Sequence, residues 1–248
     1  LALSLRKQFG ACVLYDCMDD WEAMPGIGDE LKREGDSLAR EADCLVASSR
    51  RLSDKMGRRG LQPVLIRNGA DFAFFSSASP RGLLANISKP VVGYFGALAE
   101  WFDFKLVAEV AKLRPGYSFV LIGGAGLEAD VQNKEISLLR KLPNVHLLGH
   151  KPYVLMPSYL AEFDACMVPF VLNEVTHATD PVKLYEYFSQ GKPVVATAMS
   201  ELAGLDGMVY LASDARDFAA RLDAALGEQD PEIKQRRIDY AGESSWAG

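Results

Sequence analysis

Short, uniformly apolar runs recur along the chain, and amphipathic stretches separate them. The runs at 44–47 (C-L-V-A), 91–95 (V-V-G-Y-F) and 118–122 (S-F-V-L-I) do not alternate between apolar and polar residues. This pattern is typical of strands in a parallel sheet, because helices cover both faces of such a sheet. It therefore predicts a doubly wound α/β protein built from strand–helix units with right-handed crossovers.

The expected strands and helices follow one another along most of the chain. Strands are expected at 11–15, 44–47, 63–66, 91–95, 118–122, 145–148, 165–168, 193–197 and 208–211. Helices are expected at 29–40, from a cap at Ser49 to about 58, at 103–113, within 128–142, at 157–161, 180–189 and 214–226, and as a polar helix toward Tyr240. The segment 71–89 is rich in Ser and shows no periodicity, so we expect a linker or an extended excursion there.

Three expected strands precede this segment and six follow it, so the chain divides unequally. We expect the C-terminal part of one Rossmann-like domain over 1–72, a linker over 73–89, a complete Rossmann-like domain over 90–228 and a helical tail over 229–248. The sequence begins with Leu-Ala-Leu rather than with Met, which predicts that it belongs to a longer protein.

Charge and composition argue against several classes of protein. There are 27 Lys and Arg residues against 33 Asp and Glu, a net charge of −6, so we expect no nucleic-acid partner. No apolar run approaches the ~18 residues of a membrane span, and the N-terminus does not resemble a signal peptide. We expect a cytoplasmic protein. We also expect no metal site, because no cluster of His, Cys or carboxylate residues has the spacing of metal ligands. Buried free thiols are expected at Cys12, Cys17, Cys44 and Cys166.

The segment 180–197 (D-P-V-K-L-Y-E-Y-F-S-Q-G-K-P-V-V-A-T) carries the strongest signal of a site. Asp180 is expected to cap a helix, and Leu184 is expected to face the sheet. Lys183 lies in the first turn, where a cation opposes the helix dipole and a bound anion would stabilise it. Glu186, on the same face, is placed to accept hydrogen bonds from a ribose diol. The alternative is an exposed ion pair between Lys183 and Glu186.

This segment, read as P-x-K-L-Y-E-Y-F-x-x-G-K-P-V-V-A-T, resembles the donor-site helix of GT-B glycosyltransferases. More narrowly, it is similar to family-4-like bacterial enzymes of polysaccharide assembly, of the teichuronic-acid and exopolysaccharide type. Further similar motifs occur in the same order at 66–71 (I-R-N-G-A-D), 92–98 (V-G-Y-F-G-A-L), 119–123, 144–149 and 163–170 (F-D-A-C-M-V-P-F). The resemblance extends over nearly all of residues 10–225 and implies the GT-B fold.

The resemblance implies a hexosyltransferase that moves a sugar from a nucleotide diphosphate sugar to a polysaccharide or lipid-linked acceptor. UDP is favoured over GDP, and retention of configuration without a metal ion is expected. The nucleotide sugar is a substrate, so no cofactor is implied. Any peripheral membrane association would involve a preceding N-terminal part. That part would also hold most of the acceptor site, so the isolated chain is expected to bind nucleotide but to turn over poorly.

The resemblance also assigns roles by position. Lys183 would contact the diphosphate and assist catalysis, and Glu186 would bind the ribose hydroxyls. The implied nucleotide site comprises Gly96, Ala97, Leu98, His150, Tyr153, Lys183, Leu184 and Glu186. In the turn 96–98, a glycine lets backbone N–H groups approach the phosphates, because it has no Cβ. The loop 149–153 would lie beside the base.

The sequence departs from the family at the first glutamate of its E-x7-E pattern, where it has Ala178. The sugar or phosphate contacts of that glutamate are therefore expected from Asn173, Glu174, His177, Thr179 or Asp180. The candidates for the donor sugar are Asn173, His177, Thr179 and Asp180. This departure leaves the identity of the donor sugar open.

Two carboxylates, Asp19 and Asp20, follow the first expected strand. The carboxyl ends of parallel strands face the ligand crevice, so either residue is a candidate to orient or deprotonate an acceptor hydroxyl. Helix capping or simple solvation is the alternative for both. Stabilisation of the leaving diphosphate by cations is expected to contribute most to catalysis.

Two other functions stay open at this point. A nucleotide-sugar epimerase has the same architecture and would release free sugar or an epimer without an acceptor. A nucleotide-sugar-binding module without catalytic activity would show no transfer under any condition.

Overall fold

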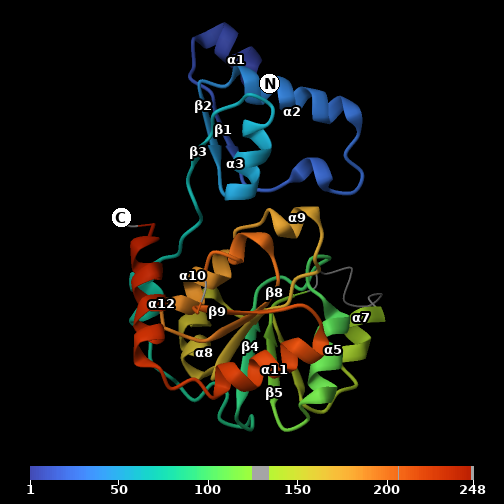
Figure 1. Cartoon of the computed structure of the whole chain (residues 1–248), viewed down its shortest axis with the longest axis vertical. Helices are drawn as coiled ribbons and strands as arrows, with labels where there is room; N and C mark the ends of the chain where they lie inside the picture. The colour runs from blue at the N-terminus through green and yellow to red at the C-terminus, as the bar shows by residue number, and fades with distance from the viewer. Residues whose placement is uncertain (125–133, 206, 247–248) are drawn as a thin grey trace. The chain divides into compact units, whose positions relative to one another are not determined.

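The computed structural model describes residues 1–124, 134–205 and 207–246, and these form two compact units (Figure 1). Unit 1 consists of Leu1–Asn68, Leu172–Asp180 and Met199–Glu201. Unit 2 consists of Gly69–Val171, Pro181–Ala198 and Leu202–Gly248. Unit 1 therefore includes two short segments from the region 90–228, for which the sequence predicted a single domain.

Unit 1 contains a three-stranded parallel sheet in the order β1-β2-β3. Its strands are β1 (Leu14–Cys17), β2 (Cys44–Ala47) and β3 (Val64–Leu65). Its helices are α1 (Ala2–Phe9), η1 (Trp21–Ala23), α2 (Asp29–Glu41), α3 (Arg50–Gly57) and α9 (Glu174–His177). The predicted cap of α3 is confirmed, because the Ser49 hydroxyl accepts the N–H of Leu52 at 3.2 Å. The core of the unit packs Cys17, Leu45, Leu52, Met56 and neighbouring residues between the sheet and α2 and α3.

Unit 2 contains a six-stranded parallel sheet in the order β6-β5-β4-β7-β8-β9. The strands are β4 (Val91–Phe95), β5 (Ser118–Ile122), β6 (Val145–Gly149), β7 (Ala165–Val168), β8 (Val194–Thr197) and β9 (Val209–Ala212). The first strand in sequence, β4, lies in the middle, and the chain proceeds outward from it in both directions. This is the predicted doubly wound order.

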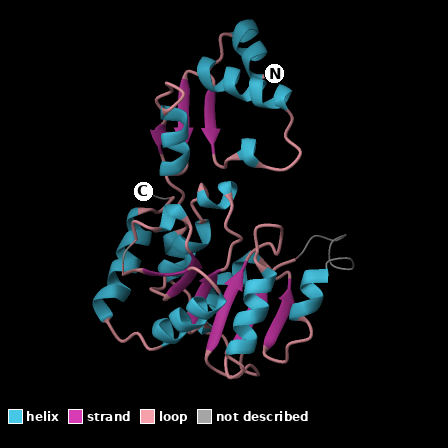
Figure 2. Ribbon diagram, turned by 45° about the vertical axis from the view of Figure 1, so that its right-hand side comes forward, coloured by secondary structure: helices cyan, strands magenta, loops and turns pink. Residues whose placement is uncertain are grey.

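Two groups of helices cover the faces of this sheet (Figures 1 and 2). One group comprises α5 (Phe104–Leu113), α7 (Lys134–Leu139) and α11 (Ala215–Leu226). The other comprises α4 (Phe72–Ser76), α8 (Met156–Glu162), α10 (Val182–Phe188) and α12 (Pro231–Glu243). The 3₁₀ turn η2 (Tyr153–Leu155) also belongs to unit 2, and the first two residues of the turn η3 (Ser200–Leu202) belong to unit 1. Every residue of β4, β5, β7 and β8 is buried, which explains their uniformly apolar sequences.

The segment expected as a linker, 73–89, belongs to unit 2 and contains most of α4. Phe75 is fully buried, and Leu84 is 5% exposed. The Glu162 carboxylate accepts the backbone N–H groups of Leu83 and Leu84 at 2.7 and 2.8 Å. Single apolar anchors and one carboxylate therefore hold a segment that has no sequence periodicity. The helix predicted within 128–142 lies partly outside the described residues, and α7 is its described portion.

Two of the four cysteines differ from expectation. Cys17 and Cys166 are buried, but Cys12 and Cys44 are exposed. Both exposed residues lie at the start of a strand region in a small sheet, where an apolar neighbourhood in sequence does not ensure burial. In the part of the chain that is described, no helix combines the length and the apolar composition needed to cross a membrane.

Candidate functional site

The carboxyl end of β4 is the expected ligand position in unit 2. The strand β5 pairs with β4 on one side, and β7 pairs with it on the other. In open α/β sheets, ligands bind outside the carboxyl ends of the strands at such a switch point, because the two connections leave in opposite directions. The glycine turn 96–98 directly follows β4 and so lies at this point.

Gly96 allows the side chain of Lys183 to lie against this turn. The φ angle of Gly96 is 141°, a conformation that side chains disfavour. A Cβ at this position would lie 2.1 Å from Cε and 2.6 Å from Nζ of Lys183. The Lys183 ammonium also lies 5.6 Å from the centre of the Tyr94 ring. The fold thus brings together two residues that the sequence assigned to the same site.

Lys183 forms no salt bridge with any described carboxylate. Burial lowers the pKa of its ammonium, and the nearby charge of Glu186 opposes this shift. A desolvated cation without a counter-ion favours an anionic ligand, because the anion replaces the water that the ammonium has lost.

Glu186 is 6% exposed, and its Oε1 accepts a hydrogen bond from the Tyr153 hydroxyl at 2.9 Å. Burial raises the pKa of this carboxyl, whereas the Tyr153 hydrogen bond and the charge of Lys183 lower it. An exposed ion pair between Lys183 and Glu186, the alternative left by the sequence, does not form. The arrangement instead presents one cation and one carboxylate from the same helix, each kept apart from the other.

The turn after β4 offers fewer free amide groups than the sequence predicted. The Gly96 N–H donates to the Ile122 carbonyl at 2.9 Å, and the Leu98 N–H donates to the Gly124 carbonyl at 3.2 Å. Both amides are therefore used by the neighbouring strand end. Ala97 is exposed, and its N–H has no hydrogen-bond partner within residues 1–124, 134–205 and 207–246.

Three further predicted nucleotide residues have different surroundings. The side chains of Leu98 and Leu184 are buried in the core, at 4% and 0% exposure. These side chains pack in the core below the site, so only their main-chain groups could contact a nucleotide. His150 is exposed in the loop after β6.

The residues predicted to contact the donor sugar belong to unit 1, whereas Lys183 and Glu186 belong to unit 2. The Asn173 side chain caps α9 by accepting the Thr176 N–H at 2.9 Å. Asp180 is 2% exposed and accepts the Asn68 N–H at 2.9 Å. Asp180 also pairs with Arg67. The prediction that Asp180 caps α10 is wrong: the capping position is Pro181, because the Asp180 carboxylate is directed to the 67–68 segment instead.

Thr179 and His177 also make contacts within unit 1. The Thr179 hydroxyl donates to the Val175 carbonyl at 2.9 Å and lies 3.4 Å from the Asp19 carboxylate. The His177 Nδ1 accepts the Ser200 N–H at 3.2 Å, so the neutral ring carries its proton on Nε2. The His177 ring therefore retains one N–H group to donate.

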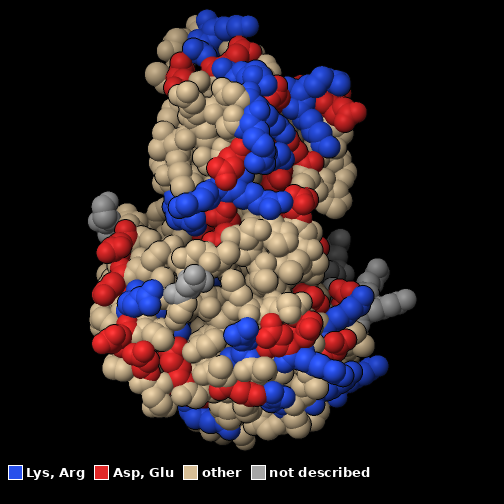
Figure 3. Space-filling view, in the orientation of Figure 1, with Lys and Arg blue, Asp and Glu red and all other residues tan. Residues whose placement is uncertain are grey.

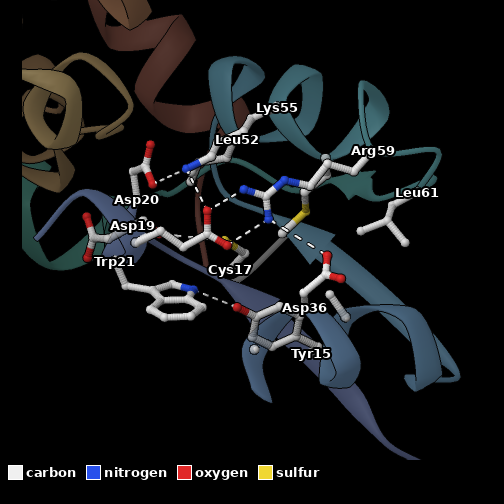
Figure 4. Close-up of a pocket in the computed structure, with 14 residues that line it drawn as sticks. Tyr15, Cys17, Asp19, Asp20, Trp21, Asp36, Leu52, Lys55, Arg59 and Leu61 are labelled. Carbon is white, nitrogen blue, oxygen red and sulfur yellow. Dashed lines mark hydrogen bonds and ion pairs between the residues drawn. The ribbon is translucent and has the colours of Figure 1, made fainter. Parts of the chain in front are cut away.

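The two candidate bases differ in their surroundings (Figure 4). Asp20 is 6% exposed and lies 2.5 Å from the Lys55 ammonium, which also contacts Glu22 at 3.1 Å. Figure 4 shows the Asp19 side chain pointing away from this ion cluster. Burial raises the pKa of Asp19, and the Thr179 hydroxyl partly opposes the shift. A raised pKa and free lone pairs favour Asp19 as a proton acceptor, whereas Asp20 is held in an ion pair.

Asp20 contributes to the lining of two hollows in unit 1. The first, drawn in Figure 4, has a volume of about 30 Å³ and is bridged by the hydrogen bond from Trp21 Nε1 to the Tyr15 hydroxyl at 2.8 Å. It has room for about one water molecule and not for a sugar. The second is an open hollow of about 470 Å³, and acidic and basic side chains share its lining. Its lining residues are Asp20, Glu22, Ala23, Lys32, Arg51, Lys55, Arg58, Arg59 and Glu174.

Several charged side chains in this unit form ion pairs. Arg51 contacts Glu174 at 2.6 Å, and Arg59 contacts Glu22. Hydrogen bonding by Arg59 lowers the pKa of Glu22 to about 2. Figure 3 shows basic and acidic side chains side by side on the viewed face of unit 1. In the described ranges, no group of three or more His, Cys, Asp or Glu residues is arranged to hold a metal ion.

The chain thus has a doubly wound parallel sheet with Lys183 beside the carboxyl end of β4, the position at which open α/β sheets bind ligands. The family model of glycosyl transferases group 1 matches residues 89–228, more than half of the chain. The chain therefore belongs to this glycosyltransferase family, and the resemblance noted in its sequence is confirmed.

One similar protein is TuaH of Bacillus subtilis, whose name assigns it to teichuronic acid biosynthesis as a glycosyltransferase. The two are 28% identical over 255 residues, which cover 94% of this chain and 64% of TuaH. The chain thus spans just under two thirds of the length of this relative.

Solved structures share the fold. HepE of Anabaena, in complex with UDP and glucose, superposes with a TM-score of 0.77 at 19% identity and covers 97% of this chain and 69% of its own. Sucrose-phosphate synthase of Thermosynechococcus elongatus has a TM-score of 0.79 at 17% identity, with coverages of 99% and 67%. These similarities confirm the predicted GT-B fold.

Proposed function

We propose that the chain binds a nucleotide diphosphate sugar, with UDP favoured over GDP, and that its protein transfers the sugar to a polysaccharide or lipid-linked acceptor. The observation that carries this proposal is the half-buried ammonium of Lys183, which lies beside Gly96 and forms no salt bridge with a described carboxylate, with the Glu186 carboxylate one turn further along α10. The UDP and UDP-glucose complexes of HepE and the name of TuaH support the choice of donor and pathway.

In the proposed division of the chain, 90–228 binds the donor, 1–72 lies on the acceptor side, and 73–89 and 229–248 are connecting and tail segments. A cytoplasmic location is part of the proposal, and the four free cysteines are compatible with a reducing compartment.

The proposed reaction exchanges one bond at the anomeric carbon of the donor. The bond from this carbon to the diphosphate oxygen breaks, and the diphosphate leaves with the electron pair. The acceptor oxygen forms the new bond and gives up its proton. Lys183 would stabilise the charge that develops on the leaving diphosphate. Glu186 would hold the ribose through hydrogen bonds from its hydroxyls. Retention of configuration and independence of a metal ion rest on the family resemblance.

Asp19 is the proposed acceptor of the proton from the acceptor hydroxyl. Its raised pKa brings its proton affinity closer to neutral pH, where transfer is more efficient. In the longer protein, Asp19→Asn should abolish transfer and leave nucleotide affinity unchanged. Full transfer activity in that variant would remove Asp19 from the mechanism.

Calorimetric titration with UDP, GDP, ADP and dTDP tests the donor site. We expect UDP to bind most tightly, and we expect Lys183→Ala and Glu186→Ala each to weaken its binding about tenfold or more, because each removes a hydrogen bond to a charged group. Lys105→Ala is the matched control, since that lysine is exposed on α5 in the same unit. Unchanged affinity in both site variants would contradict the proposal.

A further inference from the structure

Tyr153 is held by aromatic packing although it is itself 58% exposed. Its ring stacks on Phe74, with centroids 5.7 Å apart and planes inclined by 26°. The edge of Phe75 meets the same ring at 5.9 Å and 76°. These two contacts direct the Tyr153 hydroxyl to Glu186, 2.9 Å away.

The helix that supplies these two phenylalanines is itself anchored. Phe75 is fully buried and stacks on Phe95 at the end of β4, at 6.1 Å and 10°. The Phe75 carbonyl accepts a hydrogen bond from the Gln190 side chain at 2.8 Å, and the same amide donates to the Pro157 carbonyl at 2.9 Å. The Gln190 side chain, which follows α10, therefore links α4 to α8.

We infer that Tyr153 is a positioning residue for the Glu186 carboxylate, and that Phe74 and Phe75, from the segment expected to be a linker, hold it in place. The inference rests on the proposed function, in which Glu186 binds the ribose diol. Tyr153 occupies one lone pair of Oε1, and the carboxylate keeps further lone pairs for two ribose hydroxyls.

The hydroxyl of Tyr153 has a second consequence, for Lys183. Residues three apart on a helix face are neighbours, so a mobile Glu186 carboxylate would be attracted to the Lys183 ammonium. Such an ion pair would neutralise both groups. By holding Glu186, Tyr153 leaves the cation free for the diphosphate and the carboxylate free for the ribose.

The titration of Glu186 responds to the same contact. Among the described residues, the ionisable groups that face it are Tyr153 from η2, Lys183 and Tyr187 from its own helix, and Tyr94 from β4. Burial raises the pKa of Glu186, and the Tyr153 hydrogen bond lowers it. Loss of this hydrogen bond therefore raises the pKa of Glu186 further. The carboxylate then takes up its proton at a higher pH during acidification, and ribose binding is lost at that higher pH.

The test compares nucleotides with and without the ribose diol, by calorimetry on the whole chain. The ligand pairs are UDP with 2′,3′-dideoxy-UDP and GDP with 2′,3′-dideoxy-GDP. For the pair that binds, we expect Tyr153→Phe to weaken binding of the diphosphate about fivefold to tenfold and to leave the affinity for its dideoxy counterpart unchanged. The pH at which the diol preference is lost should rise. Phe74→Leu keeps the Tyr153 hydroxyl but removes the ring that stacks on Tyr153. It should change the affinity for the diphosphate, and the pH at which the diol preference is lost, in the same direction as Tyr153→Phe but by less.

Tyr210→Phe is the matched control, because it removes another tyrosine-to-glutamate hydrogen bond of unit 2, from Tyr210 to Glu228 at 2.8 Å. It should leave the diol preference as in the unmodified protein. Equal weakening of both nucleotides by Tyr153→Phe, or an unchanged diol preference, would overturn the inference and leave the proposed function intact. If the unmodified protein itself fails to distinguish the two nucleotides, the assignment of Glu186 to the ribose fails, and the inference fails with it.

Discussion

At the scale of single residues, the position of the Lys183 side chain depends on the absence of a side chain at position 96. The Lys183 side chain occupies the space that a Cβ would need, and the φ angle of 141° is itself unfavourable for other residues. At position 178, by contrast, a small side chain replaces a larger one of the family. Ala178 is 1% exposed in the core of unit 1, where a family glutamate would have to be buried.

We predict that Gly96→Ala lowers nucleotide affinity about tenfold and the free energy of unfolding by about 1–3 kcal/mol, because the new methyl group displaces Lys183 and strains the backbone. Calorimetry and denaturant unfolding measure the two effects. Gly116→Ala is the control, since its Cβ would meet no atom within 4 Å. Normal nucleotide binding by Gly96→Ala would show that the position of Lys183 does not matter.

At the scale of elements, the C-terminal helix α12 is fastened by one fully buried arginine. Both terminal nitrogens of Arg237 bond to the Glu228 carboxylate at 2.6 and 2.8 Å, and its Nε donates to the Met208 carbonyl at 2.8 Å. The guanidinium also lies 5.9 Å from the centre of the Phe188 ring of α10. The arginine therefore links α12 both to the loop before β9 and to the helix that carries Lys183.

We predict that Arg237→Met destabilises the protein by about 3–5 kcal/mol, because it leaves the nearly buried Glu228 carboxylate without its charged partner. Arg221→Met removes an exposed pair within α11 and should cost less than about 1 kcal/mol. Denaturant unfolding gives both values. Adding Glu228→Gln to Arg237→Met should recover part of the loss, and failure to recover any would show that packing rather than charge is responsible.

At the scale of the whole molecule, the two units have separate cores of different quality. The strands of unit 2 are fully buried in its centre, but in unit 1 the apolar side chains of Leu14 and Val64 are 61% and 54% exposed. Hydrophobic stabilisation is proportional to the apolar area removed from water, so unit 1 gains less from folding.

We therefore predict that unit 1 unfolds at a lower denaturant concentration than unit 2. Trp21 lies in unit 1, whereas Trp101 and Trp246 lie in unit 2. Fluorescence of a variant carrying Trp101→Phe and Trp246→Phe reports on unit 1, and fluorescence of Trp21→Phe reports on unit 2. Coincident transitions in the two variants would show that the units unfold together.

The family resemblance supplied the role of Gly96. The sequence patterns by themselves determined most of the strands and helices, the doubly wound class and the pairing of Lys183 with Glu186 as candidate residues. These features follow from local patterns: apolar runs, the Ser49 cap, and the spacing of residues on one helix. A local pattern can be predicted from the sequence because the residues that produce it are near neighbours along the chain.

Only the tertiary structure decided which partners these side chains acquire. Asp180, which the sequence predicted to cap a helix, instead accepts a hydrogen bond from the Asn68 N–H. The Tyr153 hydroxyl donates to Glu186, and the Tyr153 ring stacks on Phe74. The short helix α4 had no periodic signal, because one buried residue, Phe75, and a hydrogen bond from the distant Gln190 side chain hold it rather than an amphipathic face. Such contacts join residues far apart in the chain, so their energies depend on where the elements pack and have no signature in any local stretch of sequence.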